Sequence, residues 1–249
     1  MGGPGDAGPR RGVGSVSRRG RRSLAVESRN PGLGIAHTWH FLCRSLQNPR
    51  GVGAIAPSSR ALAVALMEPY CNAEGPARIL EVGAGTGAIT RHLGAVLKPG
   101  DELDVCEPDP KFVEILERDV LARPPLAAAV ARGHVRLLRR PVQELADAAA
   151  YDFVIACLPF TAFRPNDVED VFTVIRRALK PGGVLSYFEY AVCRRVSRMV
   201  SVGRNRQRIR AVSGFLDQNI RSYQFARRTV VQNLPPAHAR HLRFDHSTG

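Results

Sequence analysis

The sequence has few of the features that mark membrane-spanning or disulfide-linked proteins. Its 249 residues contain no uninterrupted apolar run close to the ~18–20 residues that a membrane-spanning helix needs, so no transmembrane segment is expected. Its five cysteines are odd in number and widely spaced, and none forms a C-x-x-C pair. A disulfide framework and a cysteine-based metal site are therefore not expected, and a reducing compartment is the default.

Acidic side chains are scarce at both ends of the chain. Residues 1–50 carry nine basic and two acidic side chains, and residues 190–249 carry twelve basic and two acidic ones. Residues 51–189 have 15 basic and 18 acidic side chains, a net charge of −3 in a chain whose formal net charge is +14. This distribution indicates a near-neutral body whose two ends meet an anionic surface, either nucleic acid or membrane.

Apolar side chains are scarce in residues 1–34, which are rich in Gly, Arg, Ser and Pro. This composition predicts a disordered tail and loosely fits an organelle transit peptide, although it lacks the apolar core of a secretory signal. Residues 35–46 then carry an apolar stripe with helical spacing. A second helix is expected over Ala61–Met67, with a serine as its N-cap.

Strands and helices alternate after residue 75, with helices of ~10–13 residues. The pattern predicts an α/β fold with a mostly parallel, twisted sheet and helices on both faces, preceded by the N-terminal helical segment. The expected strands are Arg78–Val82, Glu102–Cys106, His134–Leu138, Phe153–Ala156 and Val184–Phe188, and the expected helices are Ala88–Leu97, Pro110–Leu121 and Asp167–Leu179.

A glycine-rich turn follows the first expected strand and leads directly into a helix. Gly83, Gly85 and Gly87 allow a tight turn and a close approach of a ligand to the backbone, although such a turn also occurs without a ligand. Glu107 ends the second expected strand, where a carboxylate accepts hydrogen bonds from both hydroxyls of a ribose. A dinucleotide and S-adenosylmethionine both fit this arrangement.

The spacing of the glycines separates these two ligands. A dinucleotide fingerprint requires a third glycine three positions after Gly85, where this chain has Ala88. The sequence E-V-G-A-G-T-G instead resembles motif I of the Rossmann-like S-adenosylmethionine-dependent methyltransferases. The resemblance implies that the cofactor's methionine part lies against Gly83, Gly85 and Gly87, with its amino acid at Glu81 and its ribose at Glu107.

The segment before this motif resembles a narrower family. Residues 48–63 match the signature N-P-R-x-x-G-A-I-x-P-S-S-R-x-L-A of bacterial phospholipid N-methyltransferases, which methylate phosphatidylethanolamine and, in relatives, ornithine lipids. The resemblance implies a loop over the cofactor, with Pro57, Ser58 and Ser59 near its carboxylate. Residues 233–237, N-L-P-P-A, are a weaker match to the N-x-P-P-A near the family's C-terminus.

The end of the fourth expected strand, Cys157-Leu158-Pro159-Phe160, corresponds to the segment over the transferable methyl group in several amine methyltransferases. Leu158, Pro159 and Phe160 are therefore the implied loop for the substrate amine, which must be neutral to accept a methyl group. Other residues proposed for this step are Phe163 and Tyr187, as an aromatic wall with Phe160, and His37, His40 and Tyr190, as proton acceptors.

One position departs from the pattern of the methyltransferases. The acid that commonly contacts adenine after the third strand is replaced here by Pro141. Adenine contacts are therefore expected from backbone N–H groups or from Gln143 or Glu144.

Taken together, the resemblances predict three regions: a tail over residues 1–34, helices and a cofactor-covering loop over 35–70, and a methyltransferase domain with a basic C-terminal segment over 71–249. The predicted activity is N-methylation of an amino-lipid head group by a cytoplasmic protein bound peripherally to the anionic inner face of the membrane. Ile209, Val212, Leu216 and Ile220 form an apolar stripe beside arginines that suits such a surface, although a solvated charged face is the alternative.

An rRNA adenine dimethylase is the alternative enzyme, because its motif I is similar and basic ends suit RNA. Against it, Cys157 replaces the amide of that family's N-P-P-Y or N-L-P-Y motif, so no stable nucleic-acid partner is expected. A regulator that binds S-adenosylmethionine without catalysis is disfavoured, since motif I and Glu107 are intact.

Overall fold

The computed structural model describes residues 1–3, 59–191, 204–233 and 235–244, and all helices and strands of these residues belong to the unit of residues 31–249. Residues 4–34 of the expected tail, the helix over residues 35–46, and the loop residues Pro57 and Ser58 lie outside the described residues. Within the described ranges, no helix has the length and apolar character needed to span a membrane.

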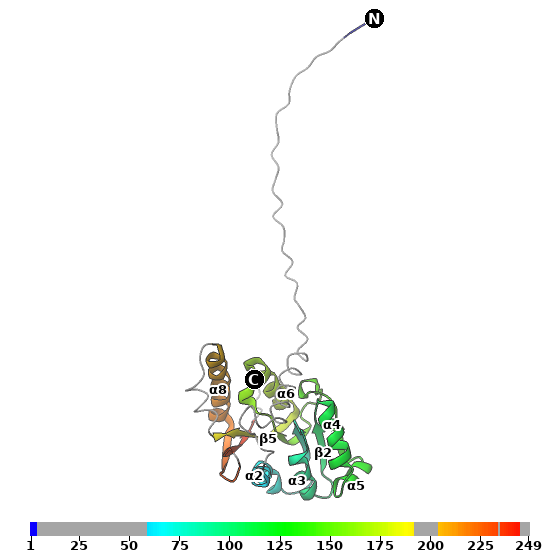
Figure 1. The fold of residues 1–249 in the computed structure, drawn as a ribbon, viewed down its shortest axis with the longest axis vertical. Coiled ribbons are helices and arrows are strands. Elements are labelled where there is room, and N and C mark those ends of the chain that lie inside the picture. Colours follow the sequence, from blue (N-terminus) through cyan, green and yellow to red (C-terminus); the bar gives the residue numbers. More distant parts are fainter. Residues whose placement is uncertain (4–58, 192–203, 234, 245–249) are drawn as a thin grey trace. The chain divides into compact units, whose positions relative to one another are not determined.

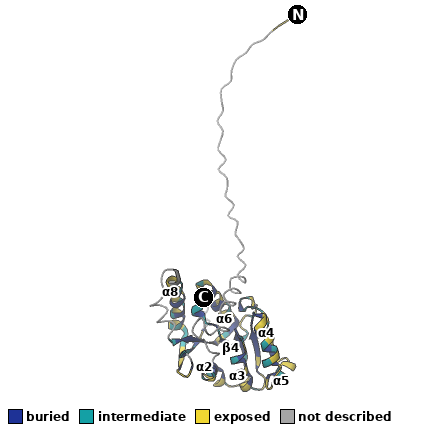
Figure 2. Ribbon diagram, in the orientation of Figure 1, coloured by how far each residue is buried: buried dark blue, intermediate teal, exposed yellow. Residues whose placement is uncertain are grey.

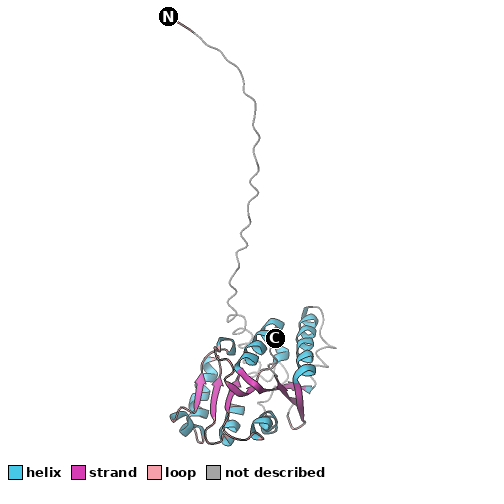
Figure 3. Ribbon diagram, turned by 180° about the vertical axis from the view of Figure 1, so that it is seen from behind, coloured by secondary structure: helices cyan, strands magenta, loops and turns pink. Residues whose placement is uncertain are grey.

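A seven-stranded sheet with the order β3-β2-β1-β4-β5-β7-β6 forms the centre of the fold (Figures 1 and 3). The first five strands pair in parallel, whereas β7 pairs antiparallel with both β5 and β6. The strands are β1 Arg78–Val82, β2 Glu102–Cys106, β3 Val135–Leu138, β4 Tyr151–Ala156, β5 Leu179–Tyr190, β6 Gln224–Val230 and β7 Ala237–Arg243.

Helices cover both faces of the sheet, and the strands between them are largely buried (Figure 2). Helices α6 and α8 pack on the face that carries Leu80 and Tyr187, and α2, α3 and α5 pack on the face that carries Ile79. The helices are α2 Arg60–Cys71, α3 Ala88–Val96, α4 Pro110–Leu116, α5 Leu126–Ala131, α6 Pro165–Ala178 and α8 Arg204–Tyr223, with short helical turns η1 Glu117–Leu121, η2 Val142–Glu144 and η3 Phe160–Ala162.

The predicted fold class, a mostly parallel sheet with helices on both faces, is confirmed. Local signals also hold: Oγ of Ser59 accepts a hydrogen bond from the N–H of Leu62 at 3.2 Å, as expected of an N-cap serine. Asp109 caps α4 in the same way, because its carboxylate accepts the N–H of Lys111 at 2.8 Å.

Three segments differ from the sequence-based expectation. The helix expected over Pro110–Leu121 leaves α-helical geometry at Glu117 and ends in the wider turn η1. Strand β5 begins at Leu179, which pairs with Tyr151, and the register shifts before Val184. The hairpin of β6 and β7 was not expected, because β6 lies at the sheet edge and exposes most of its polar side chains, so no apolar alternation marks it.

Candidate active site

The expected functional residues gather at the carboxyl ends of three neighbouring strands. Strand β1 lies between β2 and β4, and all three run in parallel. The N–H of Gly83, after β1, donates to the carbonyl of Cys106 at 2.9 Å, and the N–H of Cys157, after β4, donates to the carbonyl of Val82 at 2.8 Å. These bonds hold the three strand ends together, at the edge where ligands bind in open parallel sheets.

The glycines of the turn have positive φ angles, +75° at Gly83, +56° at Gly85 and +77° at Gly87, which other residues rarely adopt. A Cβ added at Gly85 would meet no atom within 4 Å, so this glycine faces open space where a ligand can approach. A Cβ at Gly87 would lie 2.7 Å from Cγ2 of Val120, so this glycine allows the turn to pack against η1.

Glu107 is fully buried at the tip of β2 and is fixed by backbone donors. Its Oε2 accepts the N–H of Gly85 at 2.8 Å, and its Oε1 accepts the N–H of Asp109 at 2.9 Å. Each carboxylate oxygen can accept about two hydrogen bonds. The side chain therefore holds the glycine turn and the start of α4 at the tip of β2.

Glu81 is fully buried in β1, immediately before the glycine turn. Burial raises the pKa of its carboxyl group to about 8, and the neighbouring charge of Glu107 acts in the same direction. Thr90 opposes this shift, but neither Oε2 of Glu81 nor Oγ1 of Thr90 has a hydrogen-bond partner of good geometry among the described residues. A ligand's ammonium group would supply the missing partner of this carboxylate.

A small apolar cavity of about 20 Å³ adjoins the glycine turn. It has room for about one water molecule, so a purine ring would enter only if lining side chains moved. Gln143 is part of the lining, as expected for an adenine contact, whereas Glu144 is exposed and is not. The lining residues are Val82, Gly83, Cys106, Pro108, Pro141, Val142, Gln143, Leu158, Phe163 and Val171.

The expected substrate loop begins at Cys157, whose Sγ lies 4.0 Å from Oε1 of Glu81. Burial, together with the charges of Glu81 and Glu107, raises the pKa of the Cys157 thiol well above its usual value, so the thiol stays protonated. Within the described residues, no hydrogen bond to the Cys157 carbonyl is found, whereas the Leu158 carbonyl accepts the N–H of Phe160 at 3.0 Å.

The aromatic residues of this loop lie beneath it. Phe160, Phe163 and Tyr187 are buried, with the ring centroids of Phe160 and Tyr187 5.5 Å apart. Tyr190 is also buried, against Phe188. These rings therefore support the loop, and the half-buried Cys157 and Pro159 are its more accessible members. The roles proposed for Leu158, Pro159 and Phe160 stay predictions, and His37 and His40 lie outside the described residues.

Two residues of the C-terminal segment hold the loops of the site. The side chain of Asn233 is buried, and its Oδ1 accepts the N–H of Ser59 at 3.0 Å. Arg208 donates hydrogen bonds to the carbonyls of Ala162 and Phe163 at 2.8 and 2.9 Å. The resemblance of the N-L-P-P-A segment included Asn233 but implied no role for it. No sequence signal distinguished Arg208 from its neighbouring arginines.

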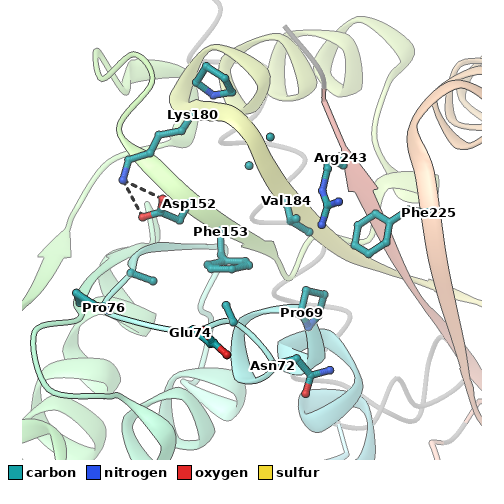
Figure 4. Close-up of a pocket in the computed structure, with 15 residues that line it drawn as sticks. Pro69, Asn72, Glu74, Pro76, Asp152, Phe153, Lys180, Val184, Phe225 and Arg243 are labelled. Carbon is teal, nitrogen blue, oxygen red and sulfur yellow. Dashed lines mark hydrogen bonds and ion pairs between the residues drawn. The ribbon is translucent and has the colours of Figure 1, made fainter.

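A larger cavity, about 530 Å³, lies at the opposite edge of the sheet (Figure 4). Its lining includes Phe153 and Lys180, near the starts of β4 and β5, and Arg243 at the end of β7. Lys180 is paired with Asp152 at 2.8 Å, and Arg243 lies over the ring of Phe225. This cavity is therefore separate from the glycine turn.

No cluster of metal-ligating side chains is found in the described part of the chain.

Comparisons with known proteins show the family to which this fold belongs. Residues 80–185 match the family described as a methyltransferase domain. The ornithine lipid N-methyltransferase of Singulisphaera acidiphila is 30% identical over 148 residues, which cover 59% of this chain and 74% of that protein.

Similar solved structures share the fold at low sequence identity. The N-methyltransferase NodS from Bradyrhizobium japonicum, in complex with S-adenosylhomocysteine, has a TM-score of 0.56 at 17% identity and covers 83% of this chain and 97% of its own. The 1,6-didemethyltoxoflavin-N1-methyltransferase of Burkholderia thailandensis has a TM-score of 0.55 at 17% identity and covers 86% of this chain and 90% of its own. The glycine turn, the two buried glutamates, the sheet order and these matches together show that the chain belongs to the Rossmann-like S-adenosylmethionine-dependent methyltransferases.

Proposed function

We propose that this methyltransferase transfers methyl groups to the amine head group of a membrane lipid, either phosphatidylethanolamine or an ornithine lipid. The similarity to the ornithine lipid N-methyltransferase carries this proposal. The resemblance of residues 48–63 to the signature of bacterial phospholipid N-methyltransferases supports it.

On the cofactor side, S-adenosylmethionine supplies an electrophilic methyl group on its sulfonium. We assign its ribose to Glu107 and its amino group to Glu81, whose buried Oε2 has no hydrogen-bond partner among the described residues. The backbone of Gly83, Gly85 and Gly87 passes beneath its methionine part. Pro57, Ser58 and Ser59 are proposed to cover its carboxylate.

On the substrate side, the chain has to align a neutral amine with the methyl group and exclude water. We propose that the loop Leu158-Pro159-Phe160 does so, with the carbonyl of Cys157 as a hydrogen-bond acceptor for the amine. The protonated Cys157 thiol is then a neutral neighbour of the reacting nitrogen.

For access to the lipid, the exposed arginines Arg206, Arg210 and Arg221 on α8, with Arg227 on β6, are proposed to contact an anionic membrane surface. Each basic side chain near such a surface contributes about 1 kcal/mol of binding free energy. The protein would then act from the cytoplasm as a peripheral protein on the inner face of the membrane.

Expression in a bacterium rich in phosphatidylethanolamine, with a radiolabelled methyl donor, tests the proposal. Label is expected in lipids separated by thin-layer chromatography, and less label is expected with the Glu107→Ala chain. Label in rRNA and none in lipid would overturn the proposal and favour the adenine dimethylase.

A further inference from the structure

Helix α8 carries several arginines, which differ in their exposure to solvent. The apolar stripe that was expected to suit a membrane surface is buried in the protein instead: Ile209, Val212 and Leu216 are buried, and the last two belong to the core formed by α6 and the sheet. Arg206 and Arg210, on either side of Arg208, are exposed, whereas Arg208 is half-buried. The partial burial of Arg208 indicates that its side chain is directed toward the protein, unlike those of its two exposed neighbours.

The guanidinium of Arg208 reaches the loop that follows β4. Its Nη1 donates to the carbonyl oxygens of Ala162 at 2.8 Å and Phe163 at 2.9 Å. These carbonyls stand at the end of the short turn η3, which spans Phe160–Ala162. A charged donor makes such hydrogen bonds roughly twice as strong as neutral ones.

The loop otherwise depends on bonds within itself and on its buried rings. The N–H of Ala162 donates to the carbonyl of Pro159, and the N–H of Phe163 donates to that of Phe160, at 2.9 and 3.1 Å. These bonds shape the turn, but they do not fix it relative to the rest of the site. Arg208 adds that link, because it comes from an element more than 40 positions away in the chain.

We propose that Arg208 is a positioning residue that holds the substrate loop, residues 158–163, in the geometry required for methyl transfer. The proposal rests on the proposed function, since it assigns the amine to this loop. Arg208 lies outside the matched methyltransferase domain, residues 80–185. The proposal therefore assigns a role at the site to the basic C-terminal segment. It also ties the loop to the helix whose exposed arginines are proposed to face the membrane.

The test compares full-length Arg208→Gln and Arg208→Lys with the parent chain. Lysine keeps the charge and one donor group but loses the fixed geometry of the guanidinium. Gln207→Ala, an exposed change on the same helix, and Arg132→Gln, an exposed arginine at the end of α5, are the matched controls.

Hydrogen–deuterium exchange of residues 158–163 is expected to accelerate in Arg208→Gln and to stay at the parent rate in both controls. In lipid–detergent micelles, kcat is expected to fall by about tenfold to a hundredfold, with partial recovery in Arg208→Lys. The Kd for S-adenosylhomocysteine, measured by calorimetry, should stay within about twofold of the parent value, since Arg208 holds the substrate loop.

Unchanged exchange, or unchanged kcat despite faster exchange, would overturn the proposal. A parallel loss of kcat, cofactor affinity and thermal stability would also overturn it, because it would show a general structural role. Failure of the parent chain to methylate any lipid would instead contradict the proposed function, and the exchange of residues 158–163 would then decide whether Arg208 holds the loop.

Discussion

The backbone N–H of Ser59 donates a hydrogen bond of 3.0 Å to Oδ1 of Asn233, which lies 174 positions later in the chain. Both residues belong to segments that resemble the phospholipid N-methyltransferases, the loop of residues 48–63 and the N-L-P-P-A segment. Asn233 also donates from Nδ2 to the carbonyl of Pro235 at 2.8 Å, which fixes its amide. The C-terminal hairpin therefore holds the start of α2, where the cofactor-covering loop is expected.

Replacement of Asn233 tests this relationship. Asn233→Ala removes the acceptor for Ser59 and is expected to weaken binding of S-adenosylhomocysteine by about fivefold, as the loss of one hydrogen bond of ~1 kcal/mol requires. Calorimetry measures the effect. Gln232→Ala, an exposed change at the neighbouring position, is the control and should bind as the parent chain does. Equal affinity of both variants would separate Asn233 from the cofactor site.

Glu107 is expected to contribute directly to cofactor affinity. Glu107→Ala removes the acceptor for the ribose and for the N–H of Gly85, so the Kd for S-adenosylhomocysteine should rise by at least about tenfold, or 1.4 kcal/mol. Glu169→Ala, at an exposed acid of α6, is the matched control. If calorimetry gave the same Kd for Glu107→Ala and the parent, the ribose assignment would be wrong.

The glycines of the turn should respond differently to alanine. Gly87→Ala combines a positive φ with a contact of 2.7 Å to Val120, so it should lower the free energy of unfolding by about 2–4 kcal/mol. Gly85→Ala meets no neighbour and should cost only the backbone strain, about 1–2 kcal/mol. Urea denaturation measures both values. In a double-mutant cycle, Gly87→Ala should cost less stability in a Val120→Ala chain than in the parent, and an equal cost in both would exclude that contact as the cause.

Glu81 is expected to oppose folding while it serves the cofactor. Its pKa rises from the usual 4.5 to about 8, so the folded state binds more protons than the unfolded state between these pH values. The free energy of unfolding therefore falls as the pH rises through this window. Glu81→Gln should be more stable than the parent at pH 8, by about 2–4 kcal/mol, yet bind S-adenosylhomocysteine more weakly. Equal denaturation curves at pH 8 would contradict this.

His241 gives the opposite dependence on pH. It is a buried residue of β7, its Nδ1 lies 2.8 Å from Oγ of Ser186 on β5, and burial lowers its pKa from 6.5 to about 4. The unfolded state therefore binds more protons between pH 6.5 and 4, and the free energy of unfolding should fall by up to about 3 kcal/mol as the pH is lowered through this range.

Denaturation of His241→Gln across the same pH range checks this contribution. The variant should lack that part of the dependence, whereas His134→Gln, at an exposed histidine, should retain it. A pH dependence that is identical in the parent and His241→Gln would contradict the assignment.

The parallel part of the fold and the cofactor edge were predictable because their signals are local. Gly83, Glu107 and the N-cap Ser59 sit in short patterns whose geometry follows from residue type. The β6–β7 hairpin was not predictable, because its arginines and histidines interrupt the alternation of apolar and polar residues that would mark strands. The contacts of Asn233 and Arg208 depend on tertiary packing across many positions, and no local pattern specifies them.

Transfer to a lipid amine is the central claim, and it can be measured with purified protein. The protein is incubated with labelled S-adenosylmethionine, vesicles of phosphatidylethanolamine or ornithine lipid containing an anionic lipid, and rRNA in the same reaction. Label is predicted in the organic phase, on a head group whose mass shows added methyl groups, and it should be reduced with Glu107→Ala at limiting S-adenosylmethionine. Label confined to the rRNA, with an unlabelled lipid phase, would contradict the account.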